Sequence, residues 1–192
     1  MPSRSLQTWK VDARSALDEI ESAHRAVGGT GRGRRRAVQQ INQAYVVLLS
    51  SQFQRFCRDL HDECSKHFVQ QPALLPYEPI LHPRFVAGRK LDIANPNPGN
   101  IGSDFARLGI DFWFDMRQLD ARNRARQGAL ESLNRWRNAI AHQDFRSSEL
   151  RGRNSVRLSE VRGWRRACER LAIDMERVMY AYLLRITGVA PW

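Results

Sequence analysis

The sequence has little cysteine, very little lysine and no long apolar run. Its three cysteines are odd in number and widely spaced, which argues against a disulfide framework and for a reducing compartment. No stretch approaches the run of about 18 apolar residues that a membrane span needs. The N-terminal segment MPSRSLQTWKVDARS has neither the apolar core nor the cleavage signal of a secretory peptide. These absences predict a cytoplasmic protein with no membrane association.

The scarcity of lysine contrasts with an abundance of arginine. The 31 basic residues include only Lys10, Lys66 and Lys90, so 28 are arginines, and the formal net charge is +11. A planar guanidinium binds a phosphate through two parallel hydrogen bonds, and basic proteins bind nucleic acid largely through backbone phosphates. RNA or DNA is therefore the expected partner. The alternative is a coding sequence rich in G and C, which favours arginine over lysine.

No long alternation of apolar and polar residues predicts a β-strand, whereas apolar residues recur every three or four positions over several stretches. The expected helices span residues 6–27, 34–69, 122–142 and 159–186, with one or two short helices within 103–120. We therefore predict an all-α protein of one domain, residues 1–192, folded as an up-and-down bundle of four to five helices.

Two stretches are expected to interrupt the helices. The glycine-rich segment 28–33 lacks the strand and the Lys-Ser/Thr ending of a phosphate-binding loop, so it predicts a turn between antiparallel helices. Residues 70–100 contain six prolines, a density that predicts a long irregular insert between the second helix and the helix of residues 122–142. Long loops of this kind usually serve function or form interfaces.

The stretch RNAIAHQDF poses a geometric problem. With Leu130 at zero on a helical wheel, Arg137 falls at roughly 340°, inside the apolar sector, and His142 at roughly 120°. A guanidinium in an apolar sector is costly unless it is paired or lies at an interface. Either the helix ends near Ala141 and the chain swings His142 round, or a second copy of the chain supplies the missing group. Both options stay open.

The same residues carry a resemblance. RNAIAH resembles the R-x4-6-H motif of the HEPN superfamily (higher eukaryotes and prokaryotes nucleotide-binding domain). NQAYVVLLSSQFQRFCRDL is similar to the long aliphatic helix of that family, and NIGSDFARLGIDFW and LSEVRGWRRACERL resemble its bacterial subgroup found near toxin and defence genes. The resemblance covers roughly residues 35–185. The chain is longer than the minimal family domain, and the resemblance does not account for the proline-rich insert.

The resemblance implies a function and its residues. Arg137 and His142 match the motif, and Asn138 matches the polar residue after the arginine. Many family members are metal-independent endoribonucleases that dimerise with the two motifs facing each other. We therefore expect a homodimeric ribonuclease toxin or antiphage effector that needs no cofactor or metal. A cognate antitoxin or regulatory protein is a possible partner.

The expected chemistry uses the 2′-hydroxyl of RNA as the nucleophile. A histidine can move the required proton at cellular pH, and Arg137 can bind the phosphoryl oxygens as their negative charge grows. The products would be a 2′,3′-cyclic phosphate and a 5′-hydroxyl, and DNA would survive.

Two other readings of the motif are open. The motif could belong to a non-catalytic module that binds RNA or a partner within a regulatory pair. Alternatively, Arg137 could form a structural salt bridge with Glu131 or Asp144, with His142 favoured at a helix C-terminus by the helix dipole.

Arginine clusters flank the motif helix on both sides, and we expect them to contact the RNA backbone, although a solvated face is equally consistent. The proposed contacts are Arg122, Arg124, Arg126, Arg146, Arg151 and Arg153. A further set, Cys57, His61, Cys64 and His67, has helical spacing, but one straight helix cannot easily enclose a tetrahedral ion. Free cysteine is usually buried, so we predict no metal site.

Overall fold

A computed structural model describes residues 1–28, 34–146, 150 and 152–192. The protein is all-α, and the described residues contain no β-strand. The helices are α1 (Arg4–Thr8), a π-helical turn (Trp9–Ala13), α2 (Arg14–Val27), α3 (Arg34–Val69), a 3-10 turn (Leu75–Tyr77), α4 (Glu78–Val86), α5 (Lys90–Ile93), α6 (Pro98–Ala106), α7 (Phe112–Leu119), α8 (Asn123–His142) and α9 (Leu158–Thr187).

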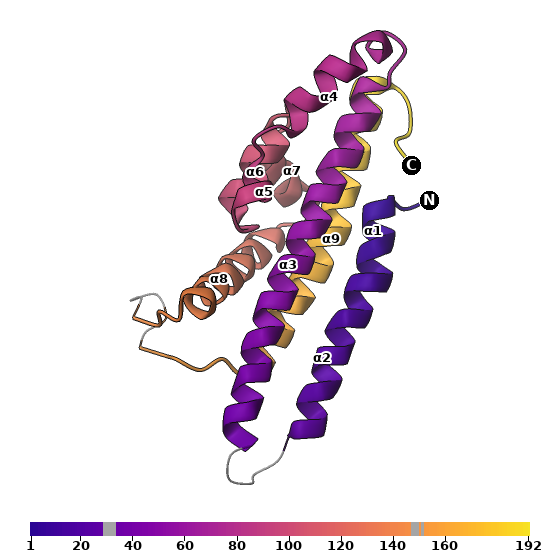
Figure 1. Ribbon diagram of the computed structural model, residues 1–192. Coiled ribbons are helices and arrows are strands. Elements are labelled where there is room, and N and C mark those ends of the chain that lie inside the picture. The colour runs from indigo at the N-terminus through magenta and orange to yellow at the C-terminus, as the bar shows by residue number, and fades with distance from the viewer. Residues whose placement is uncertain (29–33, 147–149, 151) are drawn as a thin grey trace.

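The long helices α3 and α9 lie side by side at the centre of the molecule (Figure 1). The α1–α2 segment covers them on one side, and α8 packs on the other against both. Helices α2 and α3 form an antiparallel pair, and the predicted turn falls in the sequence between them. Residues 29–33 of that turn lie outside the described part of the chain.

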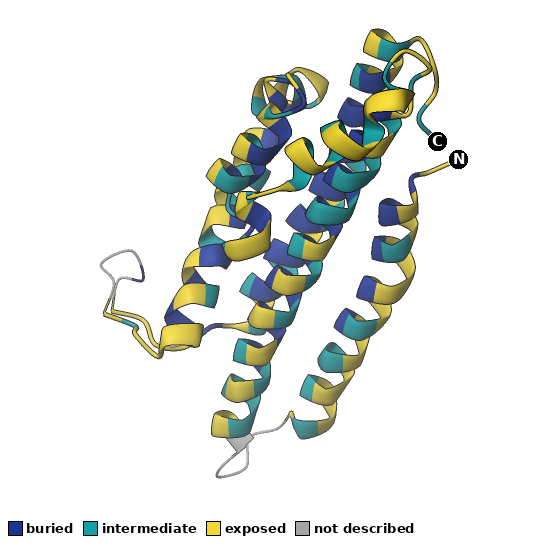
Figure 2. Cartoon of the chain, turned by 45° about the horizontal axis from the view of Figure 1, so that its top comes forward, coloured by how far each residue is buried: buried dark blue, intermediate teal, exposed yellow. Residues whose placement is uncertain are grey.

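The apolar stripe of α3 forms the middle of the core. Six of the seven stripe residues are buried, namely Val46, Leu49, Phe53, Phe56, Leu60 and Cys64, and only Phe68 is partly exposed. Figure 2 shows the same pattern along the inward faces of the other long helices. The helical spacing of apolar residues therefore predicted the limits of α3, and the residues with that spacing form its buried face.

The expectation of an irregular insert is wrong. Residues 75–86 form a 3-10 turn followed by α4, and short helices α5 and α6 complete the segment. Pro79 and Pro98 stand in the first turns of α4 and α6, where the missing N–H would have no partner within the helix. Only Pro83 lies inside a helix. Pro79 and Pro98 therefore stand at the beginnings of helices and do not interrupt them.

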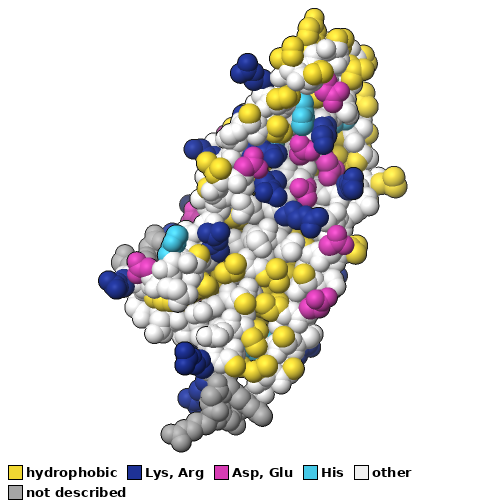
Figure 3. All heavy atoms as spheres, viewed as in Figure 1, with side chains coloured by type: hydrophobic (Ala, Val, Ile, Leu, Met, Phe, Trp, Pro, Cys, Tyr) yellow, Lys and Arg dark blue, Asp and Glu magenta, His cyan; other side chains and the backbone are white. Residues whose placement is uncertain are grey.

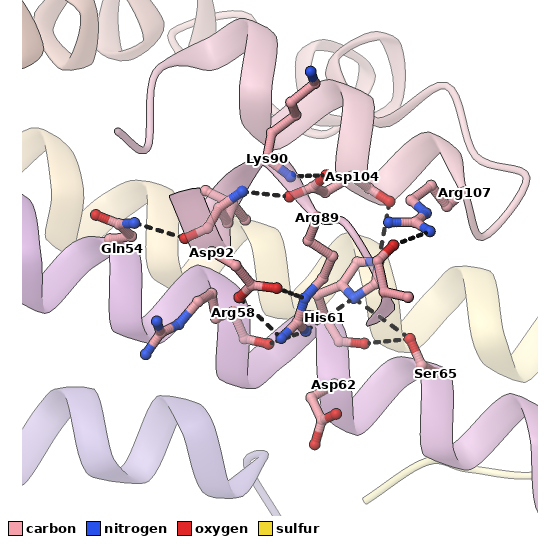
Figure 4. A network of polar contacts seen from close by, with 12 residues as sticks. Gln54, Arg58, His61, Asp62, Ser65, Arg89, Lys90, Asp92, Asp104 and Arg107 are labelled. Atoms are coloured by element: carbon pink, nitrogen blue, oxygen red, sulfur yellow. Dashed lines mark hydrogen bonds and ion pairs between the residues drawn. The ribbon is translucent and has the colours of Figure 1, made fainter. Parts of the chain in front are cut away.

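A network of polar contacts attaches α5 and α6 to α3 (Figure 4). On α3, Gln54 Nε2 donates to the carbonyls of Leu91 (2.6 Å) and Ala94 (2.9 Å). The carboxylate of Asp104 on α6 accepts the backbone N–H groups of Lys90 and Leu91, both at 2.8 Å. The segment that follows α5 is thus held in a fixed place between α3 and α8.

Buried His61 of α3 completes this network. Its Nε2 lies 3.0 Å from the carbonyl oxygen of Asp104, and since a carbonyl only accepts, this nitrogen carries the proton. Its Nδ1 then accepts from Arg89 Nη1 at 3.5 Å. Burial is the main cause that lowers the pKa of His61 to about 4, and the nearby positive charge of Arg89 is the second cause. His61 is therefore a neutral structural residue.

Candidate functional site

The C-terminal end of α8 carries the motif residues. The helix stays regular through His142, and Gln143 ends it in the left-handed conformation with φ 51°. The N–H of Asp144 donates to the carbonyl of Ala139 at 3.0 Å, which satisfies one of the last helical acceptors. The helix ends one residue after Ala141, but His142 is still helical, so no local turn swings it toward Arg137.

Arg137 lies at the edge of the buried face of α8, not at its centre. Its residue is partly exposed, whereas Trp136, Ala139 and Ile140 around it are buried. Ala141, which the helical wheel places in the apolar sector, is exposed. The buried face is rotated away from Arg137 because α8 packs on α9 as well as on α3.

Asn138 joins Arg137 to a segment distant in sequence. Its Oδ1 accepts from Arg137 Nη1 at 3.4 Å and also from Asn95 Nδ2 in the segment between α5 and α6. Sequence reasoning missed Asn95. The only signal was its place in the asparagine- and proline-rich stretch IANPNPGN, whose side-chain directions depend on the tertiary fold.

Neither carboxylate proposed as a structural partner pairs with Arg137. Glu131 forms an ion pair with Arg135 at 3.8 Å, and Asp144 Oδ1 accepts the backbone N–H of Arg146 at 3.0 Å. Within the described residues, the only polar contact of the Arg137 side chain is Asn138. Its guanidinium is consequently able to bind an external anion.

Arg137 and His142 leave α8 on different sides. Five residues of a regular helix correspond to about 140° of rotation and about 7.5 Å of rise. His142 is exposed at the last helical position, so both side chains face solvent, but one chain does not direct them at a single atom. A site that uses both on one phosphate would need two chains.

The arginine clusters lie at opposite ends of α8, separated by about 30 Å for a helix of this length. Arg122 and Arg124 are exposed at the N-terminal end, and the Arg122 hydrogen bond lowers the pKa of Asp120 to about 2. Arg126, also there, is mostly buried in an ion pair with Asp174. The clusters therefore do not form two walls of one groove beside a single motif.

Beyond the C-terminal end of α8, Arg146 is exposed and Arg151 lies outside the described residues. Arg153 forms two hydrogen bonds with Glu160, at 2.9 and 2.6 Å, and lies 5.3 Å from the ring centre of Trp136. The same side of α8 has a cavity of about 330 Å³, lined by Ser132, Arg135, Trp136, Leu150, Arg153, Glu160 and Trp164.

Basic side chains do not gather into one patch on the face shown in Figure 3. Lys and Arg alternate there with Asp and Glu, above all along α3 and α4. Two such pairs on α3 are Arg55 with Asp59 at 3.6 Å and Lys66 with Asp62 at 2.7 Å. Below them, apolar side chains gather on the surface over the lower half of α3.

The cysteines and histidines of α3 have structural surroundings. Cys57 and Cys64 are free and buried in the core, His61 binds the carbonyl of Asp104, and His67 Nε2 lies 3.2 Å from the Thr187 hydroxyl. In the described ranges, no three His, Cys, Asp or Glu side chains are grouped as metal ligands.

The protein is all-α and has a partly exposed arginine, an exposed asparagine and an exposed histidine near the end of one helix. No described helix is both long and apolar enough to cross a bilayer. Comparison with models of known protein families, with curated proteins and with solved structures finds no match.

Proposed function

We propose that the protein is a metal-independent endoribonuclease of the HEPN kind whose active site combines Arg137 and Asn138 of one chain with His142 of a second copy. The observation that carries the proposal is the end of α8. There, Arg137 and Asn138 share a hydrogen bond, and His142 is exposed five residues further along the helix, at about 140° of rotation from Arg137. Among the described residues no carboxylate pairs with Arg137, which favours an anionic ligand.

In this mechanism each residue has one task. Arg137 and Asn138 bind the non-bridging phosphate oxygens and stabilise the charge that grows on them. His142 moves a proton, either from the attacking 2′-hydroxyl or to the leaving 5′-oxygen. The 2′-oxygen forms the new bond to phosphorus as the bond to the 5′-oxygen breaks. The products are a 2′,3′-cyclic phosphate and a 5′-hydroxyl.

The requirement for two chains follows from the angle between Arg137 and His142 on α8. A two-fold axis near the C-terminal end of α8 would bring the His142 of each chain toward the Arg137 of the other. An apolar surface lies over the lower half of α3 (Figure 3), a helix against which α8 packs, and α3 also carries exposed Val47. Burial of such a surface would stabilise the dimer.

The test is cleavage of RNA in excess EDTA by the wild type, Arg137→Ala and His142→Ala. We expect cleavage by the wild type alone, with DNA of the same sequence left intact and with 5′-hydroxyl ends on the products. His24→Ala, on α2, is the matched control and should cleave like the wild type. Unchanged cleavage by both motif variants would reject the proposal.

The second candidate is a module that binds RNA or a partner protein without cutting. It is favoured by the different directions of Arg137 and His142 within one chain, which leave no complete site in a monomer. In that case the wild type and His142→Ala would leave RNA equally intact, while Arg137→Ala would still weaken binding. A role as a toxin or defence effector predicts that expression arrests growth and that His142→Ala relieves the arrest.

A further inference from the structure

We propose that Asn95 is a positioning residue for the motif, which holds Asn138 so that its amide N–H groups face a bound phosphate beside Arg137. This inference rests on the proposed function and assigns a task to the proline-rich insert, which delivers Asn95 to α8. It depends on three features of the described residues: the orientation of the Asn138 amide, the fixed place of Asn95, and the arrangement of donors around Arg137.

The orientation of the Asn138 amide follows from its neighbours. A guanidinium has only donors, so the atom of Asn138 that faces Arg137 Nη1 at 3.4 Å is the carbonyl oxygen. Asn95 Nδ2 donates to the same oxygen, and both of its lone pairs are then used. The amide nitrogen of Asn138 must point the other way, where no described side chain or carbonyl accepts from it. Because Asn138 is exposed, its two N–H donors face solvent.

The place of Asn95 is fixed by three consecutive carbonyls of its own segment. The carbonyl of Ala94 accepts from Gln54 on α3 at 2.9 Å. That of Asn95 accepts from Asn100 Nδ2 at 2.7 Å. That of Pro96, which is buried, accepts from Asn134 Nδ2 on α8 at 3.1 Å. Bonds from α3, α6 and α8 therefore hold this segment, and Figure 4 shows Gln54 among the contacts that anchor it.

The result is a pair of adjacent side chains that present donors only. Arg137 contributes its guanidinium and Asn138 contributes its amide N–H groups, while the one acceptor atom between them is already occupied. Charge-assisted hydrogen bonds of this kind are the strong ones. An arrangement of donors without acceptors selects an anion such as a phosphodiester and disfavours a cation or a neutral donor.

Two substitutions separate this role from general support of the fold. Asn95→Ala removes the donor that orients Asn138. Asn95→Asp replaces it with an acceptor, which repels the Asn138 carbonyl oxygen and attracts the Asn138 N–H groups away from the phosphate. We expect Asn95→Asp to weaken binding and cleavage more than Asn95→Ala, by about ten-fold or more for the aspartate. Asn154→Asp, at an exposed position, is the control for the change in net charge and should have a small effect.

The deciding experiment is a double-mutant cycle between Asn95 and Asn138. It measures cleavage of RNA and the Kd for a 2′-O-methyl RNA oligonucleotide, which cannot be cut, with thermal unfolding recorded for each variant. If Asn95 acts through Asn138, Asn95→Ala weakens the wild type but has no further effect in Asn138→Ala. Equal fold-losses in both backgrounds, or no loss in either, would overturn the inference.

The outcomes also separate this inference from the proposed function. If Arg137→Ala and His142→Ala abolish cleavage but Asn95→Ala behaves as the wild type, only the role of Asn95 is rejected. If the wild type does not cut RNA at all, the proposed ribonuclease is rejected. The cycle in Kd then still decides whether Asn95 positions Asn138 for phosphate binding.

Discussion

Arg126 of α8 and Asp174 of α9 form an ion pair with 2.7 Å between Nη1 and Oδ2. The two side chains are 15% and 10% exposed, and Arg126 also contacts Asp120 at 3.1 Å. This pair fastens the N-terminal end of α8 to α9. In the arginine cluster before the motif, the guanidinium of Arg126 is therefore held by ion pairs within the fold, whereas Arg122 and Arg124 face solvent.

We predict that Arg126→Ala destabilises the fold and that Arg124→Ala does not. Loss of Arg126 leaves Asp174 with an unpaired charge in a mostly buried place, and the free energy of unfolding should fall by roughly 1–3 kcal/mol, less than for a fully buried pair. Arg124 is exposed, so its removal should change stability by less than about 0.5 kcal/mol. Urea denaturation measures both, and equal midpoints would contradict the prediction.

The stability of the protein should depend on His61 between pH 6.5 and pH 4. The pKa of His61 in the fold is about 4, below the ordinary value near 6.5. As the pH falls through this window the unfolded chain gains a proton that the folded chain does not, so stability decreases, by up to about 3 kcal/mol. Below about pH 4 this dependence ends.

The matched variant for this effect is His61→Gln, whose amide can donate to the Asp104 carbonyl without titrating. Its unfolding free energy, measured by urea denaturation from pH 7 to pH 4, should change less with pH than that of the wild type. The difference between the two slopes is the contribution of His61. Parallel pH profiles would show that His61 is not a neutral buried group.

Mixed chains should reveal a composite active site. Arg137→Ala and His142→Ala are each expected to be inactive, but a heterodimer of the two contains one site with both native residues. The two variants are unfolded and refolded together in equal amounts. The mixture should recover about a quarter of wild-type cleavage, because half of the dimers are heterodimers and only one of the two sites in each heterodimer is intact.

The control for this experiment is a mixture of Arg137→Ala with the double variant Arg137→Ala/His142→Ala. No chain in this mixture has Arg137, so the mixture should stay inactive. If the first mixture also fails while wild-type dimers cut RNA, both residues act within one chain. The helix end would then have to rearrange on binding RNA.

The three cysteines should not react in the folded protein. Cys57, Cys64 and Cys168 are free and buried, and burial raises the pKa of each thiol well above its ordinary value. Since the thiolate is the reactive form, a chromogenic disulfide reagent should label none of them in buffer and all three in denaturant. Rapid labelling of the native protein would contradict this.

The sequence was informative wherever a structural feature depends on neighbours along one helix. The limits of α3 and its buried face follow from apolar spacing, as does the position of α9. The insert of residues 70–100 was misread because a proline has opposite effects in the first turn of a helix and in its interior. The number of prolines in a segment does not show which effect applies. That depends on the positions of Pro79 and Pro98 within their helices.

The same distinction between local and long-range relations applies to the candidate site. Arg137, Asn138 and His142 could be found from sequence because they lie within six consecutive positions of one helix. Asn95 could not, since its contact with Asn138 spans 43 residues and depends on how α3, α6 and α8 hold one short segment. The ion pair of Arg126 with Asp174, 48 residues apart, was hidden for the same reason.

The sequence by itself determined an all-α protein, because periodic apolar spacing acts locally along each helix. It also determined which end of α8 carries the arginine, the asparagine and the histidine. The tertiary structure alone decided that Arg137 stands at the edge of the core, with no carboxylate partner in the described part of the chain, and that Asn95 reaches Asn138. Those relations depend on the directions in which separate helices pack, which no spacing along a single helix encodes.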